Sequence, residues 1–432
     1  MILSDMEAVS RGMHALASEL YPICRSITGD GVRSTLRRLA REIPLELHEV
    51  ASGTPVFDWI VPEEWNIKAA WIKDPHGREV VNFANHNLHV VGYSIPVRGK
   101  LPLSELKSRL FSLPSQPDVI PYRTSYYKKT WGFCLPHRDL ARLEEGEYEV
   151  CIDSSLVQGS LTYGECYLAG TSAEEVLVSC HICHPSLAND NLAGIAVAVA
   201  LARHLSRNPG RLSYRFLFIP GTIGSITWLA LNPAVIPRIK HGLVLTCAGD
   251  AGPATYKQSR GGDALIDRAM RHVLKSSGTE HRIEEFEPYG YDERQYCSPG
   301  INLPVGCLMR SPHGTFSEYH TSADNLAFIK PQCLADTFSK ASAAFAILEH
   351  NARYVNLKPM CEPMLGKYGL YAGCGGQRAG DFDELALLWV LNLSDGGHDL
   401  LTIAERSGMT FDQILTASQA LVGTGLLRRE PS

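Results

Sequence analysis

Short apolar runs alternate with helical segments between residues 174 and 275, and this alternation limits the fold more than any other feature. The runs 176–180, 214–219 and 242–246 are followed by helical spacing at about 192–206, 225–231 and 263–275. Strands that are apolar on both faces are typical of a parallel or mixed sheet covered by helices on each side. We therefore predict an α/β fold with a mixed central sheet. Functional side chains are expected in the loops beyond the carboxyl ends of its strands.

The pattern of strand-like and helix-like segments divides the rest of the 432 residues into further parts. Residues 56–166 hold short β-type runs broken by prolines, with one helix expected near 104–113. A connector rich in Gly and Pro, at 359–380, precedes three helical segments. The sequence thus predicts three parts. Residues 1–55 and 167–358 together form an α/β domain, and residues 56–166 form an inserted, mostly β domain. Residues 359–432 form a connector and a C-terminal helical domain.

The balance of charge argues against polyanionic partners. The chain has 41 Lys plus Arg against 46 Asp plus Glu, and a formal net charge of −5 gives no general attraction to nucleic acid or to an acidic membrane. Helix-turn-helix spacing around 403–410 invites a DNA-binding interpretation. Eight acidic residues against three arginines from residue 381 onward instead predict packing or dimerisation. We expect no nucleic-acid or membrane partner, and a homo-oligomer stays open.

Cysteine usage and the N-terminus indicate a cytoplasmic protein. The 12 cysteines are scattered, and many lie in apolar runs, as free buried thiols do. Residues 1–7 lack a basic segment followed by a long apolar one, and no stretch reaches 18 uninterrupted apolar residues. We therefore predict neither a signal peptide nor a membrane span.

The densest chemical signal is the segment 179–194, Ser-Cys-His-Ile-Cys-His-Pro-Ser-Leu-Ala-Asn-Asp-Asn-Leu-Ala-Gly, which follows a predicted strand. His181 and Asp190 offer a nitrogen and an oxygen ligand on one strand-to-helix loop, which suits Zn²⁺. Three alternatives stay open. The Asn-Asp-Asn run only caps a helix, or His184 replaces His181 as the ligand. In the third, Cys180 and Cys183 belong to a thiolate site, although the second Cys or His pair that such a site needs is missing.

Two later loops repeat this chemistry. Residues 289–300 place Asp292 and Glu293 in a polar loop, and residues 311–324 place His313, Glu318 and His320 beyond the predicted strand 304–309. Either loop alone is typical of a solvated turn. Together with the first segment they supply His, Asp, Asp and His in order, each at the end of a strand, and this set predicts one metal site.

In this order the residues resemble the co-catalytic zinc aminopeptidases, a group that also includes carboxypeptidases and glutaminyl cyclases. The runs Cys-His-Pro-Ser-Leu-Ala-Asn-Asp-Asn and Asp-Glu-Arg-Gln-Tyr-Cys-Ser-Pro-Gly resemble more closely a bacterial aminopeptidase-like family, often described as polysaccharide-biosynthesis proteins. The resemblance covers nearly the whole chain. It implies a zinc-aminopeptidase-like domain, an inserted domain of unknown function and a C-terminal winged-helix-like domain. It also implies metal ligation by His181, Asp190 (bridging if two ions bind), Asp292 and His320.

One position departs from the pattern of these families. In the broad group the third strand ends in Glu-Glu, a general base followed by a zinc ligand, and the closer family is expected to read Pro-Glu-Thr-Ile-Gly-Ser. This chain reads Pro220-Gly-Thr-Ile-Gly-Ser225, so Gly221 replaces the base and Thr222 the second ligand. Loss of a positioned acid or base typically costs about 10²–10⁴-fold in rate. Glu293, Glu318 and His184 are candidate substitutes, and a natural or engineered change that silences hydrolysis is the alternative.

Substrate contacts are predicted from the same loops and from the insert. Tyr291, Arg294 and Tyr319 are the substrate-binding candidates. The segment 121–133, Pro-Tyr-Arg-Thr-Ser-Tyr-Tyr-Lys-Lys-Thr-Trp-Gly-Phe, is dense in aromatics and cations. Such a segment suits a lid that stacks on a substrate or pairs with its carboxylate. The alternative is an exposed hairpin that covers the core of its own module.

These observations predict a zinc-dependent amide or peptide hydrolase acting on a small peptide or an N-acylated intermediate. One Zn²⁺ ion is the preferred occupancy, because Thr222 cannot replace a carboxylate in a second site, and two ions are the alternative. The competing hypothesis is a catalytically silent binding or scaffold protein that keeps the pocket but lacks turnover because of Gly221. A transcription regulator built on the C-terminal helices is a third hypothesis, which the acidic tail disfavours.

Overall fold

The computed structural model describes residues 3–370 and 383–430, and its centre is a mixed eight-stranded sheet. The strand order is β1-β10-β12-β11-β13-β16-β14-β15. The central strands β12, β11, β13 and β16 are parallel, and the β1-β10-β12 edge and the β14-β16 pair are antiparallel. The bounds are β1 (Glu46–Ala51), β10 (Ser160–Leu168), β11 (Glu175–His181), β12 (Ser213–Ile219), β13 (Ile239–Leu245), β14 (Ala254–Lys257), β15 (His281–Glu284) and β16 (Val305–Met309).

The parallel strands are buried throughout, as their apolar sequences predict. All seven residues of β11 and all seven of β12 are buried, and His181 at the end of β11 is paired with Ile219 at the end of β12. Because parallel strands end at one edge of a sheet, the loops after β11, β12 and β16 start side by side. This edge positions the residues discussed below.

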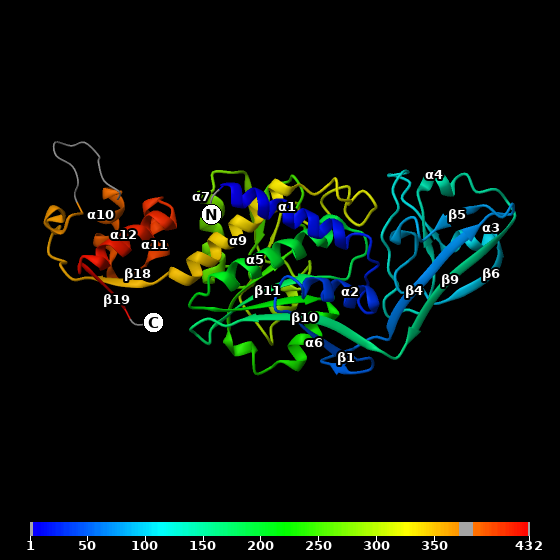
Figure 1. The fold of residues 1–432 in the computed structure, drawn as a ribbon, viewed down its shortest axis with the longest axis horizontal. Helices are drawn as coiled ribbons and strands as arrows, with labels where there is room; N and C mark the ends of the chain where they lie inside the picture. The colour runs from blue at the N-terminus through cyan, green and yellow to red at the C-terminus, as the bar shows by residue number, and fades with distance from the viewer. Residues whose placement is uncertain (1–2, 371–382, 431–432) are drawn as a thin grey trace. The chain divides into compact units, whose positions relative to one another are not determined.

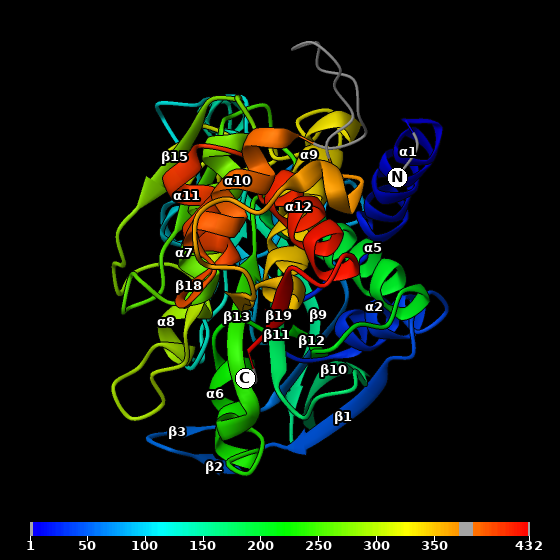
Figure 2. The ribbon, with the colours of Figure 1, turned by 90° about the vertical axis from the view of Figure 1, so that its left-hand side faces the viewer.

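Helices cover both faces of the sheet (Figure 1). Helix α5 (Gly194–Arg207) lies against β11 and β13 and packs on α1 (Leu3–Leu20), while α2 (Asp30–Leu39) contacts β10. Helix α6 (Ile223–Leu231) lies on the other face, where its residues join Leu177 and Leu217 in one apolar cluster, and the turned view shows the same separation (Figure 2). The α/β fold class predicted from the sequence is therefore observed.

A second, four-stranded antiparallel sheet lies between β1 and β10 in the chain. Its order is β5-β4-β9-β6, formed by β5 (Glu79–Asn82), β4 (Glu64–Lys73), β9 (Glu147–Val157) and β6 (Val97–Pro102). It has its own core, which includes Ile72, Val150 and Phe133. The helix expected near 104–113 is shorter: α3 (Leu103–Leu106) and a 3-10 turn end before β7 (Leu110–Phe111), which pairs with β8 (Phe133–Cys134). Strand pairing overrides helical spacing there.

Residues 265–281 and 340–432 form a unit that is described separately from the rest of the chain. It contains α7 (Leu265–Ser276), the end of α9 (Pro331–His350), and a three-stranded sheet of β17 (Arg353–Asn356), β18 (Asp395–Asp399) and β19 (Leu427–Arg429). The three helices expected in the tail are observed as α10 (Glu384–Leu393), α11 (Leu400–Ser407) and α12 (Phe411–Gly423), capped by Asp383, Asp399 and Thr410. Residues 371–380 of the predicted connector lie outside the described residues.

Candidate metal centre

The predicted metal-binding segment follows β11 directly. His181 is the last residue of the buried strand, and the chain then loops to η3 (Ala188–Ala193), a turn that contains Asp190 and leads into α5. Asp190 departs from helical geometry, with φ −110° and ψ 80°. The carboxylate of Asp324 fixes this turn, because it accepts the backbone N–H groups of Asn189 at 2.6 Å and of Asp190 at 3.0 Å. The Asn-Asp-Asn run therefore does more than cap a helix.

The Asp190 carboxylate lies between two imidazoles. Its Oδ1 is 2.8 Å from Nε2 of His181, and its Oδ2 is 3.0 Å from Nε2 of His320. Both Asp190 and His181 are fully buried, while the His320 side chain is 34% exposed and opens the group to solvent on one side. Burial acts to raise the pKa of Asp190, but the imidazoles of His184, His181 and His320 outweigh it and hold that pKa well below its usual range.

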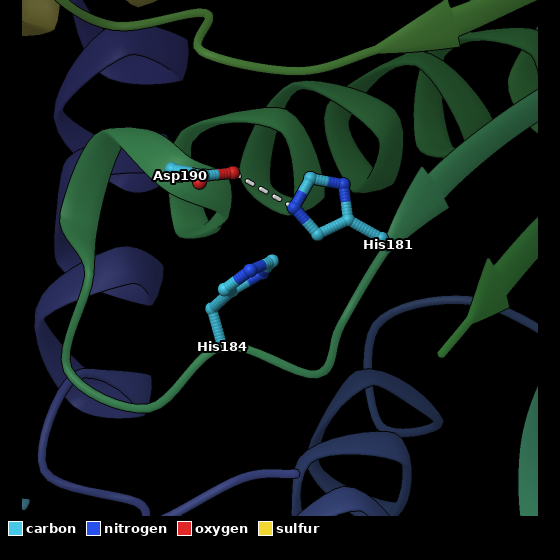
Figure 3. Close-up of side chains that lie close together, drawn as sticks. All are labelled: His181, His184 and Asp190. Atoms are coloured by element: carbon cyan, nitrogen blue, oxygen red, sulfur yellow. Dashed lines mark hydrogen bonds and ion pairs between the residues drawn. The ribbon is translucent and has the colours of Figure 1, made fainter. Parts of the chain in front are cut away.

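His184 lies in the same group (Figure 3). One ligand atom from each of His181, His184 and Asp190 falls within 4.8 Å of the others. Burial holds the pKa of His184 well below its usual value, so the ring is neutral at pH 7, as a metal ligand must be. The sequence offered His181 and His184 as alternative ligands, and both imidazoles lie in the group with Asp190. No cysteine belongs to this group in the described part of the chain, and burial raises the pKa of the Cys183 thiol to about 12, which disfavours a thiolate site.

Asp292 lies next to His181 but outside this three-residue group. It directly precedes α8 (Glu293–Tyr296), its Oδ1 accepts a hydrogen bond from Ser225 Oγ at 2.8 Å, and its buried Oδ2 has no hydrogen-bond partner among the described residues. Burial raises the pKa of Asp292 to about 6. A buried carboxylate with one unsatisfied oxygen, near the imidazole of His181, fits the border of a cation site, because a cation nearby would offset its buried negative charge.

Position 221 faces this group. A Cβ atom on Gly221 would lie 3.0 Å from Cβ of His181 and 3.6 Å from both carboxylate oxygens of Asp292. A longer side chain at this position would therefore start next to His181 and Asp292. Thr222 is the N-cap residue of α6. Neither residue brings a carboxylate to the site.

The two glutamates predicted as substitutes lie apart from the imidazoles. Glu293 is fully buried, its Oε1 pairs with Lys257 Nζ at 2.5 Å, and its Oε2 has no partner among residues 3–370 and 383–430. Glu318 is partly exposed and accepts a hydrogen bond from Ser317 Oγ at 2.9 Å. The described contacts link neither glutamate to His181, Asp190 or His320.

Two of the three predicted substrate-binding residues stack on histidines of this group. The Tyr291 ring stacks on His181 with centroids 4.1 Å apart, and the Tyr319 ring stacks on His320 at 3.9 Å. Their hydroxyl groups are 3.0 Å apart. Arg294 lies on α8, and its Nε has no partner within the described residues.

Two residues that border the group were not singled out from the sequence, although one of them belongs to the predicted lid segment 121–133. Tyr122, from the inserted segment, places its ring 5.1 Å from that of His184 and 5.0 Å from that of His320, and its backbone N–H donates to the His320 carbonyl at 2.7 Å. The aromatic composition of residues 121–133 was the available signal. Arg25 donates from Nε to the His184 carbonyl at 3.0 Å. Nothing in the sequence near Arg25 indicates this contact, which joins residues 159 positions apart.

The mixed sheet and the group at its carboxyl edge define a protein with the zinc-aminopeptidase fold. A zinc aminopeptidase from Bacillus subtilis superimposes with a TM-score of 0.58 at 12% identity, over 78% of this chain and 95% of that one. The chain belongs to the family described as Domain of unknown function (DUF4910), which matches residues 14–351, and a winged helix-turn-helix family matches residues 352–429. These matches confirm the predicted aminopeptidase-like family and its C-terminal winged-helix domain.

Two matches from Clostridium acetobutylicum cover almost the whole chain. One is provisionally named a polysaccharide biosynthesis protein with an aminopeptidase-like domain, and it is 51% identical over 416 residues, 96% of each chain. The other is the crystal structure of a provisionally named peptidase, with a TM-score of 0.95 at 49% identity over 99% of this chain and 98% of that one. Within the described residues, no helix is long and apolar enough to cross a bilayer.

Proposed function

We propose that this protein is a zinc-dependent amide hydrolase of the aminopeptidase-like type. The observation that carries the proposal is the Asp190 carboxylate, which reaches His181 with one oxygen and His320 with the other. A carboxylate oriented in this way between two imidazole nitrogens offers the mixed oxygen and nitrogen ligands that zinc hydrolases use. The Asp324 carboxylate fixes the conformation of this residue by accepting the backbone N–H groups of Asn189 and Asp190, and a metal ligand requires such support.

Of the four ligands predicted from the sequence we keep His181 and Asp190, add His184, whose ligand atom lies within 4.8 Å of theirs, and place His320 on the second oxygen of Asp190. Asp292, the fourth predicted ligand, is given a different role below. One ion is the preferred occupancy, because Gly221 and Thr222 bring no carboxylate for a second. When bound, zinc supplies Lewis acidity that polarises the amide carbonyl and makes a water molecule more acidic. The chain itself supplies orientation, since the hydroxyl groups of Tyr291 and Tyr319 meet at the rim of the group and can donate to a substrate oxygen.

Asp292 is our candidate for the group that moves the proton. Its carboxylate lies 3.6 Å from the position that a Cβ of residue 221 would occupy, and Oδ2 is free to accept a hydrogen bond. Glu293 is less suited to this role, because Lys257 holds one of its oxygens. In this scheme Oδ2 of Asp292 takes the proton of the attacking water and returns it to the leaving amine. As substrate we propose a small peptide, an N-acylated amino acid or an N-acylated amino sugar, of which the amino sugar is suggested by the name of the polysaccharide-biosynthesis relative.

The catalytically silent binding protein is the second candidate, and Gly221 favours it. The wall of the site lacks a side chain at the position where the resemblance predicts the general base. Such a protein would bind zinc and ligand with the same residues and release no product.

Amide hydrolysis by the full chain separates the two candidates. The purified protein, loaded with one equivalent of zinc, is incubated with aminoacyl amides, dipeptides and N-acetylated amino acids, and released amine is quantified. We expect hydrolysis that disappears with a chelator and returns with zinc, and that Asp190→Asn abolishes. The exposed Asp118→Asn variant, whose partner is Arg138 on the surface, serves as the control. Zinc binding without release of amine from any probe would establish the silent alternative.

A further inference from the structure

Arg25 is a buried cation with one unused nitrogen. It lies in the turn between α1 and α2 and is 1% exposed. Nε donates to the carbonyl of His184 at 3.0 Å and Nη1 donates to the carbonyl of Leu20 at 2.7 Å, whereas Nη2 has no hydrogen-bond partner among the described residues. Two of the three guanidinium nitrogens thus donate to backbone carbonyls, and the third has N–H groups that remain available to another acceptor.

The described residues also give Arg25 no carboxylate partner, although every other buried arginine in this part of the chain, such as Arg215 with Glu175, forms an ion pair. Burial lowers the pKa of Arg25 to about 10, so the guanidinium stays charged at neutral pH. A buried charge with neither a counter-ion nor a full set of hydrogen bonds is costly in a folded protein. Such a group is suited to a ligand that supplies the missing negative charge.

The guanidinium of Arg25 lies beside the loop that carries the candidate metal ligands. Arg25 holds the carbonyl of His184, whose imidazole belongs to the group with His181 and Asp190. Tyr122 in turn covers His184 and shares a hydroxyl contact of 3.1 Å with Tyr126.

We propose that Nη2 of Arg25 binds a carboxylate of the substrate next to the metal centre, so that the site selects amides bearing a free carboxylate near the scissile bond. The inference rests on the proposed function and names a substrate class for it. A carboxylate is favoured over a phosphate because one guanidinium supplies a single positive charge, while Asp190 and Asp292 nearby repel a dianion. The hydroxyl groups of Tyr122 and Tyr126 are additional donors for the second carboxylate oxygen.

The test compares two probes that differ only in this charge, N-acetylglycine and N-acetylglycinamide. Their affinities for the full chain are measured by calorimetry after zinc has been removed with a chelator. Because charge-assisted hydrogen bonds are the strong ones, we expect the carboxylate to bind about tenfold or more tightly than the amide. Inorganic phosphate, as a third probe, should bind more weakly than N-acetylglycine.

Substitutions then assign the preference to Arg25. Arg25→Met should abolish the preference for the carboxylate, and Arg25→Lys should retain part of it because it keeps the charge. Arg138→Met is the matched control, since this exposed arginine lies outside the segment 121–133 and pairs with Asp118 on the surface. Equal binding of the two probes by the unsubstituted chain overturns the inference, as does an equal loss of both in Arg25→Met, which a purely structural role would produce. Tighter binding of phosphate also overturns it.

Zinc-loaded protein separates this inference from the proposed function. Hydrolysis of the two probes is followed by the release of glycine or glycinamide. If neither is hydrolysed while the zinc-free chain still prefers the carboxylate, the inference holds and the hydrolase assignment fails. Hydrolysis of both at equal kcat/KM, without a preference in binding, supports the hydrolase and contradicts the role of Arg25. The Arg25→Met melting temperature, compared with that of Arg138→Met, reports whether the variant is folded.

Discussion

Oδ2 of Asp190 lies 3.0 Å from Nε2 of His320, although 130 residues separate the two in the chain. The first follows β11 and the second follows β16, and the parallel sheet brings the two loops to one edge. Each residue alone has an ordinary structural explanation. Their meeting, with His181 on the other oxygen of the same carboxylate, is the observation on which the proposed metal centre rests.

Asp190→Asn should abolish specific zinc binding by the chain. The substitution keeps the shape of the side chain but removes the negative charge and replaces one oxygen by an NH₂ group, which cannot bind a cation. Loss of residues that only orient a ligand typically costs about 10–100-fold in metal affinity, so we expect a decrease of at least about 100-fold. Competition with a chromogenic chelator measures it. Unchanged affinity would show that zinc is held elsewhere.

Asp324→Ala should destabilise the turn that holds Asp190 in position. The carboxylate accepts the backbone N–H groups of Asn189 and Asp190, and both donors are buried. Leaving a buried donor unsatisfied costs about 1–3 kcal/mol. Two such donors are left unsatisfied, and the structure around them relaxes in part. We therefore expect the free energy of unfolding, measured by urea denaturation, to fall by about 2–4 kcal/mol. Zinc affinity should fall as well, whereas Asp324→Asn, which keeps one oxygen acceptor, should lose less of both.

The sequence predicted those parts of the site that depend on strands. Apolar runs buried on both faces identified β11, β12 and β13, and the polar residues directly after the strands had to lie at one edge of the sheet. His181, Asp190 and His320 were proposed from the segments that follow these strands and Asp292 from a polar loop, and the resemblance to the zinc aminopeptidases implied all four as ligands. The same reasoning did not decide between His181 and His184, because the chain leaves the strand after His181 and strand alternation no longer fixes the direction of a side chain.

Contacts made by loops could not be predicted in this way. Tyr122 reaches His320 because the inserted segment pairs with the loop after β16, and Pro121 forms a bridge with Thr321. Lys257 neutralises Glu293 from the end of β14, so the glutamate that the sequence offers as a base is engaged in an ion pair. Such pairings depend on how distant segments pack, and neither periodicity nor spacing in one sequence carries that information.

The ion-pair cluster around Asp399 should make the C-terminal unit sensitive to acid. Burial acts to raise the pKa of Asp399, but hydrogen bonds from Thr402, Asn351 and Arg268 outweigh it and lower that pKa to about 2. The unfolded pKa is about 3.9, so Asp399 stabilises the fold above about pH 4, and this contribution is lost as the pH falls towards 2. We expect Asp399→Asn to destabilise by about 2–3 kcal/mol at pH 7 and by much less near pH 2.5. Denaturant unfolding of both proteins at the two pH values, followed by circular dichroism, measures the difference. An effect independent of pH would contradict this electrostatic account.

Gly221→Glu should make the chain a faster hydrolase. The backbone at Gly221 is not in the left-handed region, and the new Cβ would lie 3.0 Å from that of His181, so a small shift of His181 must accompany the substitution. From there the introduced carboxylate can reach the metal centre and serve as the base that the resemblance implies. If Asp292 carries out this role poorly in the unsubstituted chain, the gain in kcat is up to about 10²–10⁴-fold, the usual effect of a positioned base.

Gly221→Gln separates the charge of this side chain from its size. It places the same number of heavy atoms beside His181 but cannot take a proton, so it should show the crowding without the gain, and its kcat should not exceed that of the unsubstituted chain. Zinc content and melting temperature are measured for both variants. In the absence of metal, a carboxylate at position 221 adds negative charge next to Asp292. The zinc-free Glu variant should therefore be less stable than the zinc-free Gln variant. If the Glu variant gains nothing while the unsubstituted chain hydrolyses amides freely, residue 221 is not the position of the base, and the proton is moved by a group that this chain already has.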